Sequence, residues 1–196
     1  MKKVVFFVLL ALVLAAGVAY YNFAHHIGGS GNLPLNGTPQ PWQPARLQIP
    51  RMHVNAPVIS VGRTASGEMD APTSKAYNSP YWTSVFWYAP GPAPGQEGNA
   101  VIAGHVDRAG GDPAIFWTLD SLTPGDQVSV VTFQGSVLHF QVDKVVSYPV
   151  NTPGQQAVNA VFGPTSGHHL NLITCSGVWT GNGYDRRLVV FTTQVA

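Results

Sequence analysis

Short apolar segments, separated by turns rich in glycine and proline, run from residue 45 to the end of the chain. Each segment has the length of a strand and is bounded by residues that favour turns. The clearest are ARLQIP (45–50), APVISVG (56–62), GNAVIAGH (98–105), DQVSVVTF (126–133), SVLHFQVDKVV (136–146), HLNLITC (169–175) and RLVVFTTQV (187–195). Gln134-Gly135, between the fourth and fifth, predicts a β-hairpin. Together these segments predict an all-β domain built as a closed or nearly closed barrel.

Helical signals in this region are few and short. DPAIFWTLDSL (112–122) places Pro113 directly after Asp112, which predicts a helix with an N-cap and a first-turn proline. GQQAVNAVFG (154–163) predicts one or two further turns of helix. The formal net charge is +1, so the chain has no basic field that would attract nucleic acid.

The N-terminus predicts export. Two lysines are followed by an uninterrupted apolar or aromatic run from Val4 to Tyr21. About 20 helical residues cross the core of a bilayer, so residues 1–24 are expected to form a single transmembrane anchor with the lysines in the cytoplasm. The alternative is a cleaved signal peptide, with Gly17-Val18-Ala19 as its cleavage site. Both interpretations place the remaining chain outside the cytoplasm, and the first makes it a single-pass protein of the cell membrane.

The rest of the chain divides into two parts. Residues 25–44 are rich in glycine, proline and asparagine and lack an apolar period, so they are expected to form a flexible linker. Residues 45–196 have the length of one domain with a core of its own.

Cys175 is the only cysteine of the chain. Exported proteins meet an oxidising compartment in which cysteines usually pair, and a single cysteine has no partner in its own chain. It can pair between chains, serve as a reactive thiol, or lie buried and inert. Cys175 follows LNLIT and precedes Ser176-Gly177, where a strand is expected to stop and a loop to begin. Scaffolds tend to present reactive groups at such a rim.

A nucleophilic thiol needs an imidazolium nearby, which stabilises the thiolate and can protonate a leaving amine. Most of the seven histidines lie in unsuitable places: the linker (His25, His26), a surface turn (His53), mid-strand (His139), or the far end of the strand that carries Cys175 (His168, His169). His105 remains, at the end of GNAVIAGH and therefore in the same strand-to-rim setting as Cys175. Asp107, two residues further on, could orient the imidazole.

A cationic donor would complete such a site, because attack on an amide builds negative charge on the carbonyl oxygen. Arg186 and Arg187 stand at the entry to the last predicted strand. If that strand pairs antiparallel with the strand of Cys175, an arginine returns beside the thiol. Adjacent strand residues point to opposite faces, so only one of the two arginines should reach the site.

Over residues 45–196 the chain resembles the sortases, cysteine transpeptidases of Gram-positive cell envelopes. The residues that carry the resemblance are IPRMHVNAPV, VFWYAPGPAPGQEGNAVIAGHVD, FWTLDSLTPGDQVSV, LITCSG and YDRRLVVF, in this order. The resemblance implies an eight-stranded β-barrel with the site at one end. It assigns His105 as general acid/base, Cys175 as nucleophile and Arg187 as the arginine, with Arg186 in reserve. Thr174 occupies the position before the cysteine and is expected to shape the substrate groove.

The resemblance also implies a reaction. A sortase cleaves an LPXTG-like sorting signal between Thr and Gly through a thioester, then joins the protein to an amine of a cell-wall precursor. The expected partners are therefore proteins with C-terminal sorting signals, the peptidoglycan precursor and the membrane. Some sortases depend on calcium held by acidic loop clusters; because the sequence has no such cluster, neither a metal nor a cofactor is expected. The segment around His105 looks most like class F sortases, with class E second.

Three other kinds of protein fit parts of the pattern. Another wall cysteine transpeptidase, of the L,D type, has its cysteine in a Ser-His-Gly-Cys setting with an arginine just beyond, whereas Leu172-Ile173-Thr174 precede Cys175 here. Papain-like wall hydrolases place the cysteine before the histidine and on a helix. A non-enzymatic alternative is an exported module that binds an extended peptide and needs the groove but not the thiol.

Overall fold

The computed structural model describes residues 38–152 and 156–196. The proposed membrane anchor at 1–24 lies outside the described residues, as do His25, His26 and most of the proposed linker. Within the described part, no helix combines the length and apolar character needed to cross a membrane.

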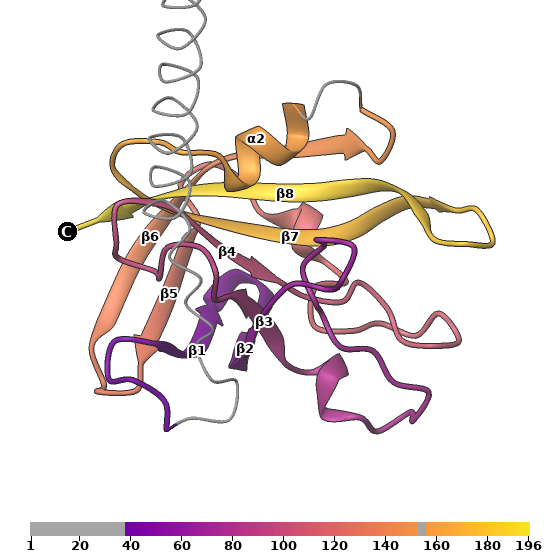
Figure 1. Ribbon diagram of the computed structural model, residues 1–196, viewed down its shortest axis with the longest axis horizontal. Coiled ribbons are helices and arrows are strands. Elements are labelled where there is room, and N and C mark those ends of the chain that lie inside the picture. Colours follow the sequence, from indigo (N-terminus) through magenta and orange to yellow (C-terminus); the bar gives the residue numbers. More distant parts are fainter. Residues whose placement is uncertain (1–37, 153–155) are drawn as a thin grey trace, which may run out of the picture. The chain divides into compact units, whose positions relative to one another are not determined.

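Eight strands form a closed barrel, which confirms the predicted all-β class and the eight-stranded barrel that the sortase resemblance implies (Figure 1). The strands are β1 (Pro44–Ile49), β2 (Val54–Val61), β3 (Val85–Tyr88), β4 (Gly98–Ala103), β5 (Gln127–Thr132), β6 (Val137–Pro149), β7 (His168–Trp179) and β8 (Tyr184–Val195). The short helices are the 3-10 turns η1 (Pro50–Met52), η2 (Pro80–Trp82) and η3 (Leu119–Ser121), and α2 (Gln156–Phe162).

The order around the barrel is β1-β2-β3-β4-β7-β8-β6-β5, and β5 pairs with β1 to close it. Two pairs are parallel, β2 with β3 and β4 with β7, and the others are antiparallel. The β5–β6 hairpin turns at Gln134-Gly135 as predicted, with Gly135 at a φ of 88°. The strand that carries the cysteine therefore lies between β4 and β8.

Alternation along β7 separates two apolar clusters. Leu170 and Leu172 point into the barrel, where they join the main core of large aliphatic and aromatic side chains, including Leu47, Val85, Trp87, Ile102, Phe116, Phe140 and Val190. Ile173 points to the opposite side of the sheet and packs in a second cluster with Val101 and Val189. Cys175 is two residues beyond Ile173 and shares its outward face.

The helix α2 covers this outer face of β4, β7 and β8 (Figure 1). Val161 packs in the outer cluster, and the buried amide of Asn171 donates to the Val161 carbonyl at 2.8 Å and to the Asn99 side chain at 3.2 Å. Asn99 in turn donates to the Gly163 carbonyl at 2.8 Å. These bonds satisfy polar groups at the C-terminal end of α2 and attach the helix to the sheet. The helix predicted near residues 154–163 is thereby confirmed.

Two predicted features need correction. Residues 112–122 form only the short turn η3 rather than a helix, because their backbone N–H groups bond across to other segments: Ala114 to Val106, Ile115 to Trp82 and Phe116 to His105. In addition, β7 does not stop at Cys175 but continues to Trp179. Beyond the barrel it pairs, among residues 38–152 and 156–196, with β8 alone, and the two strands extend as a ribbon (Figure 1).

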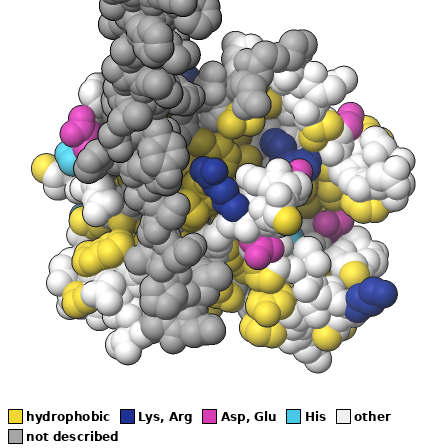
Figure 2. Space-filling model, viewed as in Figure 1, with side chains coloured by type: hydrophobic (Ala, Val, Ile, Leu, Met, Phe, Trp, Pro, Cys, Tyr) yellow, Lys and Arg dark blue, Asp and Glu magenta, His cyan; other side chains and the backbone are white. Residues whose placement is uncertain are grey.

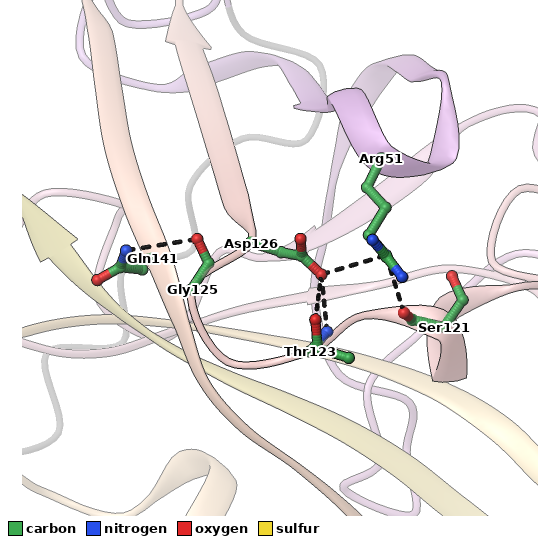
Figure 3. Close-up of polar contacts among 6 residues, drawn as sticks. All are labelled: Arg51, Ser121, Thr123, Gly125, Asp126 and Gln141. Carbon is green, nitrogen blue, oxygen red and sulfur yellow. Dashed lines mark hydrogen bonds and ion pairs between the residues drawn. The ribbon is translucent and has the colours of Figure 1, made fainter.

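A small polar network joins η1 to the start of β5 (Figure 3). Arg51 lies 3.3 Å from the Asp126 carboxylate and donates to the Ser121 carbonyl at 3.0 Å. The Thr123 backbone N–H and hydroxyl also donate to Asp126, and the backbone bond is the main cause that lowers the pKa of this carboxyl. On the face seen in Figure 2, acidic and basic side chains are scattered among polar and apolar ones, in keeping with the low net charge.

Candidate active site

Cys175 and Arg187 are fixed relative to each other by strand register. In the antiparallel pair of β7 and β8, Cys175 lies directly opposite Arg187. Directly paired residues of neighbouring strands project to the same face about 5 Å apart at Cα. The two side chains therefore share the outer face, and both are half-buried. On the other side of β8, Tyr148 of β6 pairs with Arg187.

His105 reaches the same face from β4. The parallel pairs of β4 and β7 run from Gly98 with His168 to Ala103 with Ile173, and the Gly104 N–H donates to the Ile173 carbonyl at 3.1 Å. Two further residues along each chain bring His105 level with Cys175. Cys175 thus lies between Arg187 on β8 and His105 just past the end of β4, and His105 and Cys175 line one pocket.

The connection to His105 is tightly packed. Gly104 is buried, and a Cβ atom in its place would overlap the ring of the core residue Phe116. The Thr174 hydroxyl donates to the Gly104 carbonyl at 2.8 Å. Thr174 is buried on the face of β7 opposite to Cys175, so its hydroxyl holds the strand end that leads to His105.

Three neighbours hold the imidazole of His105. Its ring makes edge contacts with Trp82 of η2, at 5.0 Å between centroids, and with Phe86 of β3, at 5.4 Å. Its Nε2 lies 2.8 Å from the Pro72 carbonyl. A carbonyl can only accept, so Nε2 carries a proton, and in the neutral ring Nδ1 is then the basic nitrogen. The group that orients the imidazole is therefore the Pro72 carbonyl and not the Asp107 carboxylate.

Asp107 instead pairs with the β7–β8 ribbon. The Tyr184 hydroxyl donates to the Asp107 carboxylate at 2.6 Å, and Tyr184 makes an edge contact with Trp179 at 5.5 Å. The bond to the carboxylate is the main cause that raises the pKa of Tyr184 to about 12, so the phenol stays protonated as a donor.

The two arginines have different surroundings. Arg186 donates to the Ser147 hydroxyl at 2.7 Å and to the Ser147 carbonyl at 2.9 Å, both on β6. Arg187 donates to the carbonyls of Tyr184 and Arg186 at 3.1 and 3.0 Å. Register and alternation thus give Arg187 the face of Cys175 and turn Arg186 away from it.

Opposing influences act on the thiol. Burial is the largest and raises the pKa of Cys175, because a charged thiolate is poorly solvated there. The Arg187 guanidinium lowers the pKa, and the Asp107 carboxylate raises it. The net direction is upward, so most of the free protein holds Cys175 as the neutral thiol at neutral pH.

Two pockets meet at Cys175. The small pocket has a volume of about 260 Å³ and is lined by residues that include Phe116, Trp117, Thr174 and Leu188. The large pocket has a volume of about 880 Å³ and is lined by residues that include Lys75, Trp82, His105, Asp107, Arg108 and Trp179. Val106, Cys175 and Tyr184 line both. Within the parts of the chain that the structure describes, no three His, Cys, Asp or Glu side chains gather as a metal site would require.

Residues 47–195 match the sortase domain family. The chain belongs to the sortase family. Sortases as a family are cysteine transpeptidases, which makes this the reaction class to propose for the barrel. Among curated proteins, none matches the sequence.

Solved sortase structures share the fold of this sortase domain. Sortase C of Streptococcus pneumoniae is 19% identical with a TM-score of 0.57, over 77% of this chain and 65% of that chain. Sortase C of Clostridium perfringens SM101 is 16% identical with a TM-score of 0.58, over 93% and 88%. A lid mutant of sortase A from Corynebacterium diphtheriae is 18% identical with a TM-score of 0.57, over 83% and 74%. The chain thus spans just under two thirds of the length of the pneumococcal sortase.

Several neighbours of the site were not predicted from the sequence. Pro72 lies in a loop 33 residues before His105, and Trp82 lies in η2, 23 residues before it. No local sequence pattern predicts that either segment reaches His105. Tyr184 lies two residues before Arg186, but a half-buried tyrosine near a hairpin turn carries no sequence signal of its own. The pairing of Asp107 with Tyr184 depends on the β7–β8 ribbon, and the strand predicted to end at Cys175 continues to Trp179.

Proposed function

We propose that this sortase is a membrane-anchored, extracytoplasmic transpeptidase that cleaves an LPXTG-like signal between Thr and Gly. It then transfers the protein to an amine of a cell-wall precursor. The observation that carries the proposal is the position of Cys175 between Arg187, its partner across β7 and β8, and His105, which follows β4 and lines the same pocket as Cys175. The family supports the reaction class, and the apolar run Val4–Tyr21 supports the anchor.

In this mechanism Cys175 is the nucleophile. The reactive form has the thiolate and the His105 imidazolium together, a minor form because burial raises the pKa of the thiol. The thiolate attacks the threonyl carbonyl carbon, and the negative charge that builds on the carbonyl oxygen is stabilised by the Arg187 guanidinium. His105 donates its proton to the departing glycyl nitrogen, which leaves a thioester on Cys175.

The second half of the reaction reverses these roles. An incoming amine attacks the thioester carbonyl and gives its proton to neutral His105. The carbon–sulfur bond breaks, the new amide leaves, and Cys175 returns as the thiolate beside the imidazolium. Thr174 contributes indirectly through its bond to the Gly104 carbonyl, one residue before His105. Arg186 donates to Ser147 and alternation turns it away from the face of Cys175, so this mechanism assigns the chemistry to Arg187.

We further propose that the protein belongs to class F, with class E as the alternative. The support is the segment GNAVIAGHVD, which ends in the proposed general acid/base and resembles class F sequences. The solved neighbours named above are of classes C and A, and their identities of 16–19% support the shared fold.

Mass spectrometry of the full chain in detergent tests the proposal. The protein is incubated with an LPXTG peptide and triglycine, and Cys175→Ala is run in parallel. We expect wild type to show a thioester adduct and a threonyl-triglycine product, and Cys175→Ala to bind the peptide without forming either.

The same experiment tests the competing hypothesis, in which the protein is an exported module that binds a peptide without cleaving it. It predicts equal peptide binding by both proteins, with no adduct and no product from wild type across a library of peptides and several amines. That result would reject the transpeptidase.

A further inference from the structure

The two pockets beside Cys175 differ in which proposed catalytic groups they contain. His105 lines the large pocket and is absent from the lining of the small one. The small pocket is bounded instead by Phe116, Trp117 and Leu188. Cys175, at the boundary, can carry an acyl group while the space on the His105 side stays open to a second molecule.

Proton transfer determines on which side an amine must stand. The leaving amine takes its proton from His105, so it departs on the side of the imidazole. The acceptor amine gives its proton to the same imidazole and attacks the same carbon, since the second step is the microscopic reverse of the first. Under the proposed function, the large pocket is therefore the one through which amines leave and enter.

Asp107 gives this pocket a carboxylate. Among the described residues it is the one acidic side chain in the lining, and it is half-buried close to Cys175 and His105. The Tyr184 hydroxyl donates to Oδ2 at 2.6 Å and fixes the group, while Oδ1 accepts no hydrogen bond from the described residues. A fixed carboxylate oxygen beside a reacting centre is suited to hold an ammonium group.

The cations of the large pocket do not neutralise Asp107 directly. Arg108 donates to the carbonyls of Pro113 and Tyr77 at 3.2 and 3.3 Å, and its guanidinium lies over the Tyr77 ring at 4.9 Å. Lys75 is exposed at the pocket edge. Among the described residues, neither is paired with the Asp107 carboxylate in an ion pair.

We propose that the large pocket is the acceptor site and that Asp107, held by Tyr184, binds the ammonium group of the acceptor. This inference rests on the proposed function and adds the recognition of the second substrate. The ligand class is a primary amine that is protonated in solution, at the end of a flexible peptide or side chain.

The cost that Asp107 imposes on the first step supports this role. A carboxylate near Cys175 opposes the thiolate, since it raises the pKa of the thiol, so it hinders acylation. After acylation the sulfur is an uncharged thioester and the penalty disappears. The same carboxylate then attracts the incoming ammonium, which must release one proton to solvent before its nitrogen can attack. It also favours the imidazolium that forms when His105 takes the second proton from the attacking amine.

The test measures how the acyl-enzyme divides between amine and water. Full-length protein in detergent is given an LPXTG peptide with either triglycine, which is cationic, or hydroxylamine, which is uncharged at neutral pH. The ratio of aminolysis to hydrolysis is independent of the acylation rate. For Asp107→Asn we expect the ratio with triglycine to fall about tenfold, as for the loss of one charged hydrogen bond. The ratio with hydroxylamine should stay within about twofold of wild type.

Asp112→Asn is the matched control, because Asp112 lies in the same loop, is exposed and lines neither pocket. It should behave as wild type with both amines. Tyr184→Phe keeps the charge of Asp107 and removes its tether, so it should lower the triglycine ratio by a smaller factor. If Asp107→Asn fails to fold, the salt dependence of the wild-type triglycine ratio and Tyr184→Phe still decide the matter.

Three results would overturn the inference. An unchanged triglycine ratio in Asp107→Asn excludes ammonium binding by Asp107. An equal fall with triglycine and hydroxylamine shows a general distortion of the pocket rather than recognition of charge. A wild-type protein that forms no thioester adduct rejects the proposed function itself, and the inference fails with it.

Discussion

The two sides of Cys175 are built in different ways. On the β8 side, Arg187 is fixed by the hydrogen-bond ladder of two long antiparallel strands. On the β4 side, His105 lies just past a strand end, and its ring is held by Pro72, Trp82 and Phe86 from other segments. Strand register fixes the first side as soon as the barrel forms, whereas the second depends on loop packing. The position of Arg187 relative to Cys175 should therefore resist changes in the loops, whereas the position of the His105 ring should depend on them.

The largest effect is expected on the β8 side of Cys175, where strand pairing positions Arg187. Arg187→Ala removes the cation opposite Cys175, and turnover of an LPXTG peptide should fall about 100- to 1000-fold, as for the loss of an oxyanion donor. Arg186→Ala removes the bonds to Ser147 and should leave turnover within a few-fold while lowering stability by about 1 kcal/mol. Steady-state kinetics and urea unfolding give both numbers. Equal losses of turnover in the two variants would show that register does not select the arginine.

The next largest effect is expected on the β4 side, where His105 lies. Gly104→Ala places a methyl group against the Phe116 ring, and overpacking of this kind costs about 1–3 kcal/mol. Because Gly104 leads directly to His105, turnover should fall as well. Gly62→Ala is the control: Gly62 follows β2 as Gly104 follows β4, and a Cβ atom there meets no described atom within 4 Å. Urea unfolding followed by tryptophan fluorescence should separate the two variants, and equal stability would contradict the close packing.

The same contrast explains how much could be predicted from the sequence. Alternation and turn residues identified most strands of the barrel, and alternation predicted that only one of Arg186 and Arg187 reaches Cys175. The choice of Arg187 came from the sortase resemblance, and the strand register pairs Arg187 with Cys175. The strand β3 was missed, because all four of its residues, VFWY, are buried and show no period of two. The expected helix at 112–122 failed because tertiary backbone bonds to Val106, Trp82 and His105 replaced local ones.

Prediction therefore failed where distant segments meet. The Pro72 carbonyl is invisible in a sequence, since a backbone group carries no residue-type signal. The Asp107–Tyr184 bond joins residues 77 positions apart, and neither has a local pattern that requires it. The roles of His105, Cys175, Arg187 and Thr174 stay predictions, which the variants described here address.

A smaller effect is expected from Thr174, and it tests whether the Thr174 hydroxyl helps to position His105. Thr174→Val keeps the shape but leaves the Gly104 carbonyl without its hydroxyl donor, at a cost of about 1–3 kcal/mol. Thr192→Val is closely matched: Thr192 is also buried and donates to the Leu170 carbonyl at 2.7 Å, away from the site. We expect similar losses of stability and a loss of turnover in Thr174→Val alone. Equal turnover would limit Thr174 to a role in folding.

The smallest effect is a shift in the pKa of the Cys175 thiol, which compares the charge of Arg187 on one side with that of Asp107 on the other. Alkylation of Cys175 by iodoacetamide follows the thiolate, so its pH midpoint should lie above that of the same protein unfolded in urea, because burial raises the pKa. Arg187→Ala removes the cation that lowers the pKa and should move the midpoint further up. Asp107→Asn removes the anion that raises it and should move the midpoint down. Shifts of the same sign in both variants would mean that a change in burial, and not the two charges, controls the thiol.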